Sequence, residues 1–192
     1  MPTLTTPRLR LRPLTLEDAP AIFAYAQDPE VSRYTAWEPH RSLADSEAFI
    51  RDYALPRYAA GLPEPYGLTL PGDDRVVGTV GCFAVTPDRH TMELAYALAR
   101  PLWGQGLVCE AARALLDHVF AHFPVRRLQA RCKQENLASA RVMEKLGMRH
   151  EGVLRAALWH RGRDWDMVFY SVLRHEWPGA PPVLDDAPVS ET

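Results

Sequence analysis

Residues 98–110 read Leu98-Ala-Arg-Pro-Leu-Trp-Gly104-Gln-Gly106-Leu-Val-Cys-Glu110. An apolar strand pattern ends at Leu98, two glycines follow, and a helical pattern begins after Gly106. Such a turn aims free backbone N–H groups and the positive end of a helix dipole at one point, which suits a phosphate or pyrophosphate. Glycine keeps the backbone accessible to a ligand and allows the positive φ that such turns often need. The stretch predicts an anion site at the start of a helix, although a lone Gly-x-Gly also fits a plain strand-to-helix turn.

Two other phosphate-binding motifs are excluded by the residues around these glycines. The chain has no Gly-Lys-Ser/Thr here, so the turn is not the P-loop of an NTPase. Cys109 occupies the place of the third glycine in the dinucleotide-binding fingerprint, and the turn follows a series of strands rather than opening a βαβ repeat.

The residues that lead into the turn form short apolar runs separated by turn residues. Such runs predict an antiparallel meander, in which strands joined by Pro-, Gly- and Asp-containing turns pair in sequence order. The three predicted strands are Tyr66 to Leu70, Val76 to Val85 and Met92 to Leu98.

The N-terminal part of the chain predicts one strand and two helices. Arginine and leucine alternate from Arg8, which is typical of a half-buried strand over 8–14 with its arginines toward solvent. Thr15 caps a helical pattern that ends at Asp28-Pro29, and a second pattern runs from Ser42 to about Ala60. An aromatic loop at 34–39 lies between these two helices.

The C-terminal part predicts two helices, a strand and a hairpin. The amphipathic helix after Gly106 carries apolar residues at helical spacings, starting with Val108 and Ala111, and Pro124 ends it. Asn136 is a plausible N-cap, and Gly147 a plausible C′ residue, for a three-turn helix. The predicted elements after Pro124 are the strand Arg127 to Lys133, the helix Leu137 to Leu146, and the hairpin strands Gly152 to Trp159 and Trp165 to Leu173.

Length and composition predict one ordinary cytoplasmic domain. The 192 residues are 47% hydrophobic and 24% charged, and 22 basic residues nearly cancel 24 acidic ones, which disfavours nucleic acid as a partner. Three cysteines without a CxxC pair indicate reduced thiols, and neither an export signal nor a membrane-spanning run is recognisable. We expect a single domain over 1–177 and a disordered, proline-rich and acidic tail over 178–192.

Taken together, four segments resemble the GNAT superfamily of N-acetyltransferases, and specifically its RimJ/RimL-like branch. The order and spacing of these segments carry the resemblance over roughly residues 8 to 177. The segments are Arg8-Leu-Arg-Leu-Arg-Pro-Leu14, Glu93-Leu-Ala-Tyr-Ala-Leu98 with Trp103-Gly-Gln-Gly106, Asn136-Leu-Ala-Ser139 with Lys145-Leu-Gly-Met148, and Glu151-Gly-Val-Leu-Arg155. The resemblance implies an α/β (α+β) fold: a mixed, mostly antiparallel sheet of six or seven strands, splayed at its centre and flanked by about four helices.

The resemblance also implies acetyl-CoA as cosubstrate and assigns residues to it. The pyrophosphate would lie on the amides of Trp103, Gly104, Gln105, Gly106, Leu107 and Val108. Of the superfamily's Gln/Arg-x-x-Gly-x-Gly/Ala pattern only Gly106 fits strictly, and Val108 is the main departure. The pantetheine would run beside Leu98 and Ala99 as an added strand, in a slot opened by strand splaying after Leu98, with Asn136 near the sulfur.

The chemistry requires a base for the acceptor amine and a proton donor for the departing thiolate. Glu93 is the first candidate for the base, with Glu64 and His90 as alternatives, although a charged residue on a strand surface would look the same. Ser139 is the candidate proton donor, although a structural residue at N3 of a helix fits equally well. A water molecule could also mediate the proton transfer.

Tyr34 and Trp37 are candidate acceptor-binding residues because the family builds its acceptor pocket from the loop that carries them. Packing explains these two aromatic residues equally well. The acceptor is expected to be a primary amine, either a protein N-terminus or a small molecule. Exposed apolar residues on the C-terminal hairpin are candidates for a homodimer interface.

Other features are interpreted as structural. His118 and His122 lie four residues apart on a helix but lack a third ligand, so no metal site is predicted. Cys109 is interpreted as a packing residue because transfer in this family is direct. Two alternatives to an N-acetyltransferase remain at this point: a non-catalytic module that binds or senses acyl-CoA on the same fold, and a protein that binds nucleotide phosphates with the same turn.

Overall fold

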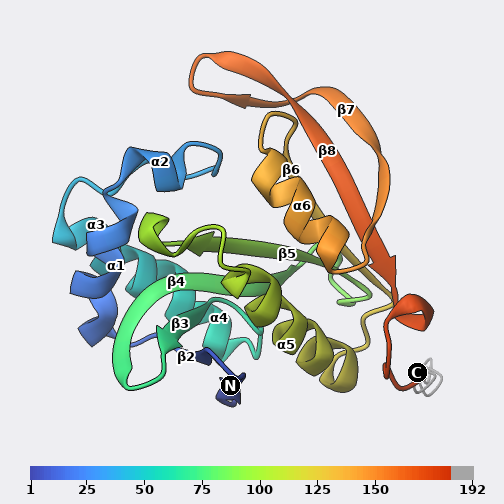
Figure 1. Ribbon diagram of the computed structural model, residues 1–192, viewed down its shortest axis with the longest axis horizontal. Helices are drawn as coiled ribbons and strands as arrows, with labels where there is room; N and C mark the ends of the chain where they lie inside the picture. The colour runs from blue at the N-terminus through green and yellow to red at the C-terminus, as the bar shows by residue number, and fades with distance from the viewer. Residues whose placement is uncertain (183–192) are drawn as a thin grey trace, which may run out of the picture.

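The computed structural model describes residues 1–182, and the greater part of the predicted tail, 183–192, lies outside the described residues. One open sheet organises the fold (Figure 1). Its spatial order is β1-β2-β3-β4-β5-β6-β8-β7, in which β5 and β6 pair in parallel and the other neighbours pair antiparallel. The strands are β1 (Leu4–Thr5), β2 (Arg10–Pro13), β3 (Tyr66–Leu70), β4 (Asp73–Ala84), β5 (Thr91–Leu98), β6 (Arg127–Lys133), β7 (Arg149–His160) and β8 (Arg163–Leu173).

This architecture confirms the expected mixed, mostly antiparallel α/β fold. The sheet of residues 1–182 has eight strands, one more than the upper expectation, because the two-residue β1 pairs with Leu11 and Arg10 of β2. The helices are α1 (Ala19–Ala26), α2 (Pro29–Ser32), α3 (Leu43–Ala48), α4 (Leu55–Ala59), α5 (Leu107–His122) and α6 (Leu137–Lys145). None of the helices in the described chain is long and apolar enough to cross a membrane.

The helix expected over 42–60 is wrong as a single α-helix. It consists of α3, a wider π-helical segment (Phe49–Ala54) and α4. Pro56 lies near the start of α4 and has no N–H to donate to the preceding turn, so the regular ladder is interrupted there. Gly61, with φ +67°, follows the last turn as expected.

Two hydrophobic clusters place helices on both faces of the sheet. The larger cluster joins α5 and α6 to one face and includes Met92, Leu94 and Leu98 of β5. The smaller cluster joins α1 and the segments around α2 to α4 to the opposite face, where Ala97 and Ala99 pack. Because side chains alternate along a strand, even-numbered residues of β5 face α5 and α6, and odd-numbered residues, including Glu93, face the other side.

The sheet opens between β5 and β6. Their parallel register ends at Glu93 opposite Gln129, although β5 continues to Leu98 and β6 to Lys133. Beyond this point β5 stays paired with β4, β6 stays paired with β8, and the two strands diverge (Figure 1). The expectation that the strands splay after Leu98 is therefore wrong by five residues, because each strand follows its antiparallel partner from Leu94 onward.

The C-terminal hairpin, β7 and β8, extends beyond the rest of the sheet (Figure 1). Its turn at Arg161 and Gly162 has positive φ values of 52° and 74°, as in the tight turns that match strand twist. The pairing is interrupted between Leu154 and Leu158, where Ala156 has φ +50°. Several large apolar side chains of the hairpin are exposed: Val153, Leu154 and Trp159.

The first residues of the predicted tail are described and contact the domain. The Ala180 N–H donates to the Trp177 carbonyl at 3.2 Å, and the Arg174 side chain donates to the Pro181 carbonyl at 2.7 Å. Ala180 also packs against the larger hydrophobic cluster. Ordered contacts thus continue past Trp177 to residue 181.

Candidate functional site

The glycine turn forms the mouth of α5. Gly104 and Gly106 have φ values of +77° and +76°, in the left-handed region that the sequence pattern predicted for them. The first hydrogen bond of the helix runs from the Glu110 N–H to the Gly106 carbonyl at 3.1 Å. The N–H groups of Leu107 and Val108 therefore precede the helical ladder and remain available to an anion, together with the positive end of the helix dipole.

The space in front of the turn is open. A Cβ placed at Gly104 would meet nothing within 4 Å, and one at Gly106 would meet only Arg8 Nη2, at 3.8 Å. Glycine is therefore needed at these positions for the backbone conformation rather than to avoid a clash within the protein. A ligand can approach the backbone directly.

Arg8 lies beside the turn and is a residue that the sequence analysis did not assign to the site. Its side chain donates to the Gln105 carbonyl at 2.9 Å and to Glu110 Oε2 at 2.7 Å. Burial tends to raise the pKa of the Glu110 carboxyl, but hydrogen bonds from Thr6 and Arg8 hold it below its ordinary value. Arg8 thus neutralises the acidic side chain in the first turn of α5. The alternating pattern showed only that Arg8 is exposed, since its partners lie about 100 residues away in sequence.

The free edge of β5 supplies backbone groups to the opening. The Val85 N–H donates to the Thr91 carbonyl at 2.9 Å, and the Ala99 N–H donates to the Val77 carbonyl at 2.8 Å. Since hydrogen-bonded pairs alternate along an antiparallel ladder, odd-numbered residues of β5 direct their backbone groups toward β4. The even-numbered residues therefore direct theirs toward the side that β6 has left; in the opening these are Leu94, Tyr96 and Leu98.

Trp103, Leu98 and Ala99 lie where this edge meets the turn. Trp103 Nε1 donates to the Leu98 carbonyl at 2.7 Å, so the Leu98 N–H is the group that remains toward the opening. Both backbone groups of Ala99 are used, because its carbonyl accepts from the Leu102 N–H at 3.0 Å. The Ala99 N–H is therefore not available to a ligand, whereas the Leu98 N–H is.

A hydroxyl pair crosses from β5 to α6. Tyr96 Oη lies 2.7 Å from Ser139 Oγ and donates to the Ser139 carbonyl at 3.2 Å. Asn136 caps α6 as predicted, its side chain accepting from the Ser139 N–H at 3.2 Å. Burial raises the pKa of Tyr96, although its hydrogen bond to Ser139 opposes this. Tyr96 was not predicted from the sequence, because between Leu94 and Leu98 it has the pattern of a core residue.

Glu93 occupies the point where β5 and β6 separate. It is 6% exposed, and its carboxylate accepts from Gln129 Nε2 at 2.7 Å and pairs with Arg131 Nε at 2.9 Å. These contacts place Glu93 on the face opposite α5 and α6 as a buried, paired carboxylate. Two donors leave further lone pairs on the carboxylate for a water or an amine.

Glu64, the second candidate base, is buried on the same face. Tyr53 Oη donates to it at 3.0 Å and Arg57 Nε at 2.8 Å. Burial raises its pKa, and the hydrogen bonds from Tyr53 and Arg57 only partly oppose this. A Cβ at Gly81, which pairs with Ala95 of β5, would collide with the Glu64 side chain, so Glu64 lies over the strand next to β5.

The remaining candidates lie outside β5 and the glycine turn. His90 precedes β5 at the closed end of the β5–β6 pair, where its ring lies 3.1 Å from Asp88. Tyr34 and Trp37 lie in the loop between α2 and α3, and the Trp37 ring packs 5.6 Å from the His40 ring, measured between centroids. The Trp37 carbonyl is held by Arg161 at the turn of the β7–β8 hairpin.

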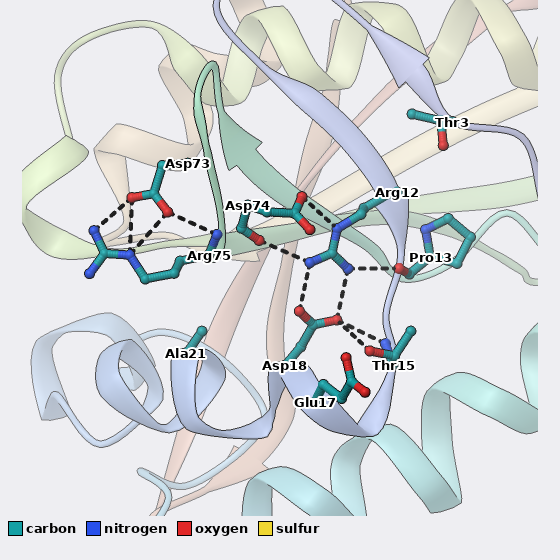
Figure 2. A pocket seen from close by; sticks show the side chains of 10 residues that line it. All are labelled: Thr3, Arg12, Pro13, Thr15, Glu17, Asp18, Ala21, Asp73, Asp74 and Arg75. Atoms are coloured by element: carbon teal, nitrogen blue, oxygen red, sulfur yellow. Dashed lines mark hydrogen bonds and ion pairs between the residues drawn. The ribbon is translucent and has the colours of Figure 1, made fainter.

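A separate hollow of about 650 Å³ lies on β2, α1 and the β3–β4 turn, away from β5 and β6. Figure 2 shows Arg12 held between Asp18 and Asp74, and Arg75 held by Asp73, so the arginines in this hollow are already paired. Within residues 1–182, no group of three or more His, Cys, Asp or Glu side chains could hold a metal ion.

Comparison with known proteins agrees with this arrangement. Residues 8–149 match a family model described as an acetyltransferase (GNAT) domain. The uncharacterized N-acetyltransferase p20 of Bacillus licheniformis is 32% identical over 182 residues, covering 93% of this chain and 100% of the relative. A GNAT acetyltransferase structure from Bacillus anthracis has a TM-score of 0.81 at 27% identity, covering 91% of this chain and 100% of that one. The ribosomal L7/L12 α-N-protein acetyltransferase RimL, solved with coenzyme A, shares the fold with a TM-score of 0.81 at 19% identity, covering 90% and 98%. The chain belongs to the GNAT family of N-acetyltransferases, and is thus an acyltransferase.

Proposed function

We propose that this N-acetyltransferase uses acetyl-CoA and transfers the acetyl group directly to a primary amine. The observation that carries the proposal is the junction of two sets of free donors. The unpaired edge of β5 from Leu94 to Leu98 leads straight to the amides at the start of α5. An extended, amide-containing chain that ends in a pyrophosphate matches this junction.

In this assignment the two ends of the cosubstrate use different parts of the site. The Trp103 N–H already donates to the Arg100 carbonyl at 3.1 Å, so the amides of residues 104–108 are the ones assigned to the pyrophosphate. The pantetheine adds to the edge of β5 as a further strand. Acetyl-CoA supplies an activated acetyl thioester. The Leu98 N–H, left toward the opening, stabilises the negative charge that develops on the thioester oxygen.

The two proton transfers are assigned to opposite faces of the opening. Glu93 removes the proton from the acceptor amine, directly or through a water, since it lies where the strands part. Glu64 is the alternative, supported by its raised pKa. Ser139 protonates the departing thiolate, and Tyr96, whose hydroxyl lies 2.7 Å from Ser139 Oγ, holds or supplies that proton.

The acceptor is assigned to the face of the sheet that carries Glu93. Tyr34 and Trp37 contribute to its binding, because their loop meets the hairpin turn on this side. A protein N-terminus and a small-molecule amine both satisfy the chemistry. The complex of RimL with coenzyme A supports the choice of cosubstrate, and the substrate in its name, a ribosomal protein N-terminus, supports including peptides among the acceptors to be tested.

The test combines binding and turnover. Calorimetry with acetyl-CoA should give a micromolar-range signal, and thiol release should appear with at least one member of a panel of N-terminal peptides, polyamines, amino acids and aminoglycosides. Binding without release for the whole panel would favour a non-catalytic acyl-CoA-binding module. ATP that competes fully with acetyl-CoA would favour a general nucleotide-phosphate site, and absence of acetyl-CoA binding would refute the proposal.

A further inference from the structure

The turn of the β7–β8 hairpin contacts a loop that is more than 120 residues away in sequence. Arg161 Nε donates to Glu38 Oε1 at 2.9 Å. The remaining nitrogens of the guanidinium donate to three backbone carbonyls of the same loop: Ser32 at 3.2 Å, Arg33 at 3.4 Å and Trp37 at 3.4 Å. One planar side chain with five donors thus holds both ends of the segment 32–38, which carries Tyr34 and Trp37.

A second set of contacts anchors this junction to β6. His160 Nε2 lies 3.4 Å from Glu38 Oε1, and His160 Nδ1 lies 3.0 Å from Lys133 Nζ. Since an ammonium only donates, Nδ1 accepts from Lys133, and Nε2 carries the ring proton toward Glu38. Lys133 is fully buried and also lies 4.0 Å from the centroid of the Trp165 ring. The hairpin end is therefore fixed to the strand that forms one side of the opening.

These contacts lie on the face assigned to the acceptor. Lys133 follows Gln129 and Arg131 at intervals of two along β6, and both of those residues bind Glu93. Side chains at such intervals share one face of a strand. The junction of His160, Glu38 and Arg161 therefore covers the far end of the surface that begins at Glu93.

The hairpin has a structural break just before this junction. Register is lost between Leu154 and Leu158, and the Ala156 N–H is satisfied by the Asp166 side chain at 2.8 Å instead of by a ladder hydrogen bond. Ala156 and Arg161 both have positive φ values, which side-chain-bearing residues rarely adopt. The segment 158–165 is thus joined to the rest of the hairpin through a bulge, and its position depends on what its turn contacts.

We infer that Arg161 is a positioning residue that latches the hairpin turn onto the loop 32–38 and thereby fixes Tyr34 and Trp37 for acceptor binding. The inference rests on the proposed function, since it concerns the acceptor half of the same site. The inference predicts different effects on the two substrates. Loss of the latch weakens acceptor binding and leaves acetyl-CoA binding unchanged, because the four hydrogen bonds that Arg161 donates within residues 1–182 all go to the loop 32–38.

The test compares three variants with the wild-type protein. Arg161→Ala removes all four contacts, and Arg161→Lys keeps a cation for Glu38 but cannot reach the three carbonyls together. Arg163→Ala is the matched control: Arg163 lies on the same hairpin, stacks on Trp165 and pairs with Glu135 at 3.3 Å, away from the loop. Each protein is measured by hydrogen exchange of peptides covering 32–38, by calorimetry with acetyl-CoA, and by steady-state kinetics with the panel amine that turns over fastest.

For Arg161→Ala we expect exchange in 32–38 to accelerate about tenfold or more, because its local hydrogen bonds are lost. The KM for the amine should rise about tenfold while kcat changes less than about twofold, which is the signature of lost ground-state binding. Arg161→Lys should give an exchange rate in 32–38 and a KM between those of Arg161→Ala and the wild type. Arg163→Ala should match the wild type in both quantities.

Unchanged exchange in 32–38 in both Arg161 variants would overturn the latch, and faster exchange with an unchanged KM would overturn its role in acceptor binding. Faster exchange outside 32–38 and 158–165 would show that a variant is generally unfolded. If Arg161→Ala is unfolded in this sense, the exchange rates and the KM of Arg161→Lys test the latch instead. If the wild type does not bind acetyl-CoA, the proposed function fails, and the exchange data alone decide whether the latch exists.

Discussion

Gly106→Asp should abolish high-affinity binding of acetyl-CoA while leaving the fold intact. The substitution places a carboxylate at the mouth of α5, where φ is +76°. Asp tolerates this conformation better than most residues, at a cost of about 1 kcal/mol of stability. Steric cost is small, because the nearest atom to the new Cβ is Arg8 Nη2 at 3.8 Å.

The loss of affinity follows from the charge. A carboxylate about 5 Å from a single phosphate charge costs about 3 kcal/mol at an effective dielectric constant of about 20. A second phosphate increases this cost, whereas attraction of the new carboxylate to Arg8 reduces it. A loss of about 3 kcal/mol corresponds to roughly 100-fold weaker binding.

Gly106→Asn provides the matched control, because it has nearly the same shape and the same tolerance of positive φ but carries no charge. Calorimetry should show that the Asp variant binds coenzyme A far more weakly than the Asn variant does. The difference between the two affinities should become smaller at higher salt, because salt screens the charge. Without ligand, the two variants should unfold at the same midpoint temperature. Equal affinities for the Asp and Asn variants at low salt would refute the assignment of the pyrophosphate to this turn.

Three further outcomes are expected. Glu93→Gln should lower kcat about 100-fold or more without weakening acetyl-CoA binding, because it removes the proposed base; if Glu64→Gln does so instead, Glu64 is the base. Ser139→Ala and Tyr96→Phe should each lower kcat, by up to about 100-fold, with an unchanged Kd for acetyl-CoA; full activity in both would exclude the hydroxyl pair as the proton donor. Asp18→Asn should cost about 3 kcal/mol at pH 7, because it breaks a buried ion pair. Burial tends to raise the pKa of Asp18, but its hydrogen bonds hold it below the ordinary value. The stabilisation by the Asp18 carboxylate is therefore complete above about pH 4 and is lost as the pH falls through the native pKa. In urea unfolding, the difference in free energy of unfolding between the wild type and Asp18→Asn should shrink in acid; a difference that does not change with pH would contradict this.

Features that depend on adjacent residues could be predicted from the sequence. The left-handed conformations of Gly104 and Gly106, the cap at Asn136 and the hairpin turn at Gly162 all arise within four residues of their own position. The strands before the glycine turn could be predicted as well, because their apolar runs and turns are local features of the sequence. Pro56 is also a local signal: it lies inside the helix predicted over 42–60, and its missing N–H accounts for the interruption that the prediction of a single helix did not include.

Contacts between distant segments could not be predicted in this way. The run from Leu94 to Leu98 has the same alternation whether or not a strand pairs with its outer edge, so the pattern could not show that β6 leaves after Gln129. Tyr96 became a candidate only once α6 placed Ser139 beside its hydroxyl. Arg8 and Arg161 look like ordinary exposed arginines until their partners, which are 102 and 123 residues away in sequence, are in place.

The two parts of the candidate site differ in the same way: one is built mainly from local contacts and the other from distant ones. The part assigned to acetyl-CoA consists largely of one continuous stretch, from β5 through the glycine turn into α5, and its donors are mostly backbone groups. A chain with a net charge of −2 can therefore present an anion site without an overall basic surface. The part assigned to the acceptor is assembled from the loop 32–38, from β6 and from the hairpin turn, and side chains such as Arg161 and His160 join these distant segments. Substitutions at this junction should therefore change which amine is bound without changing the cosubstrate, and the latch contacts are the place to alter acceptor choice by design.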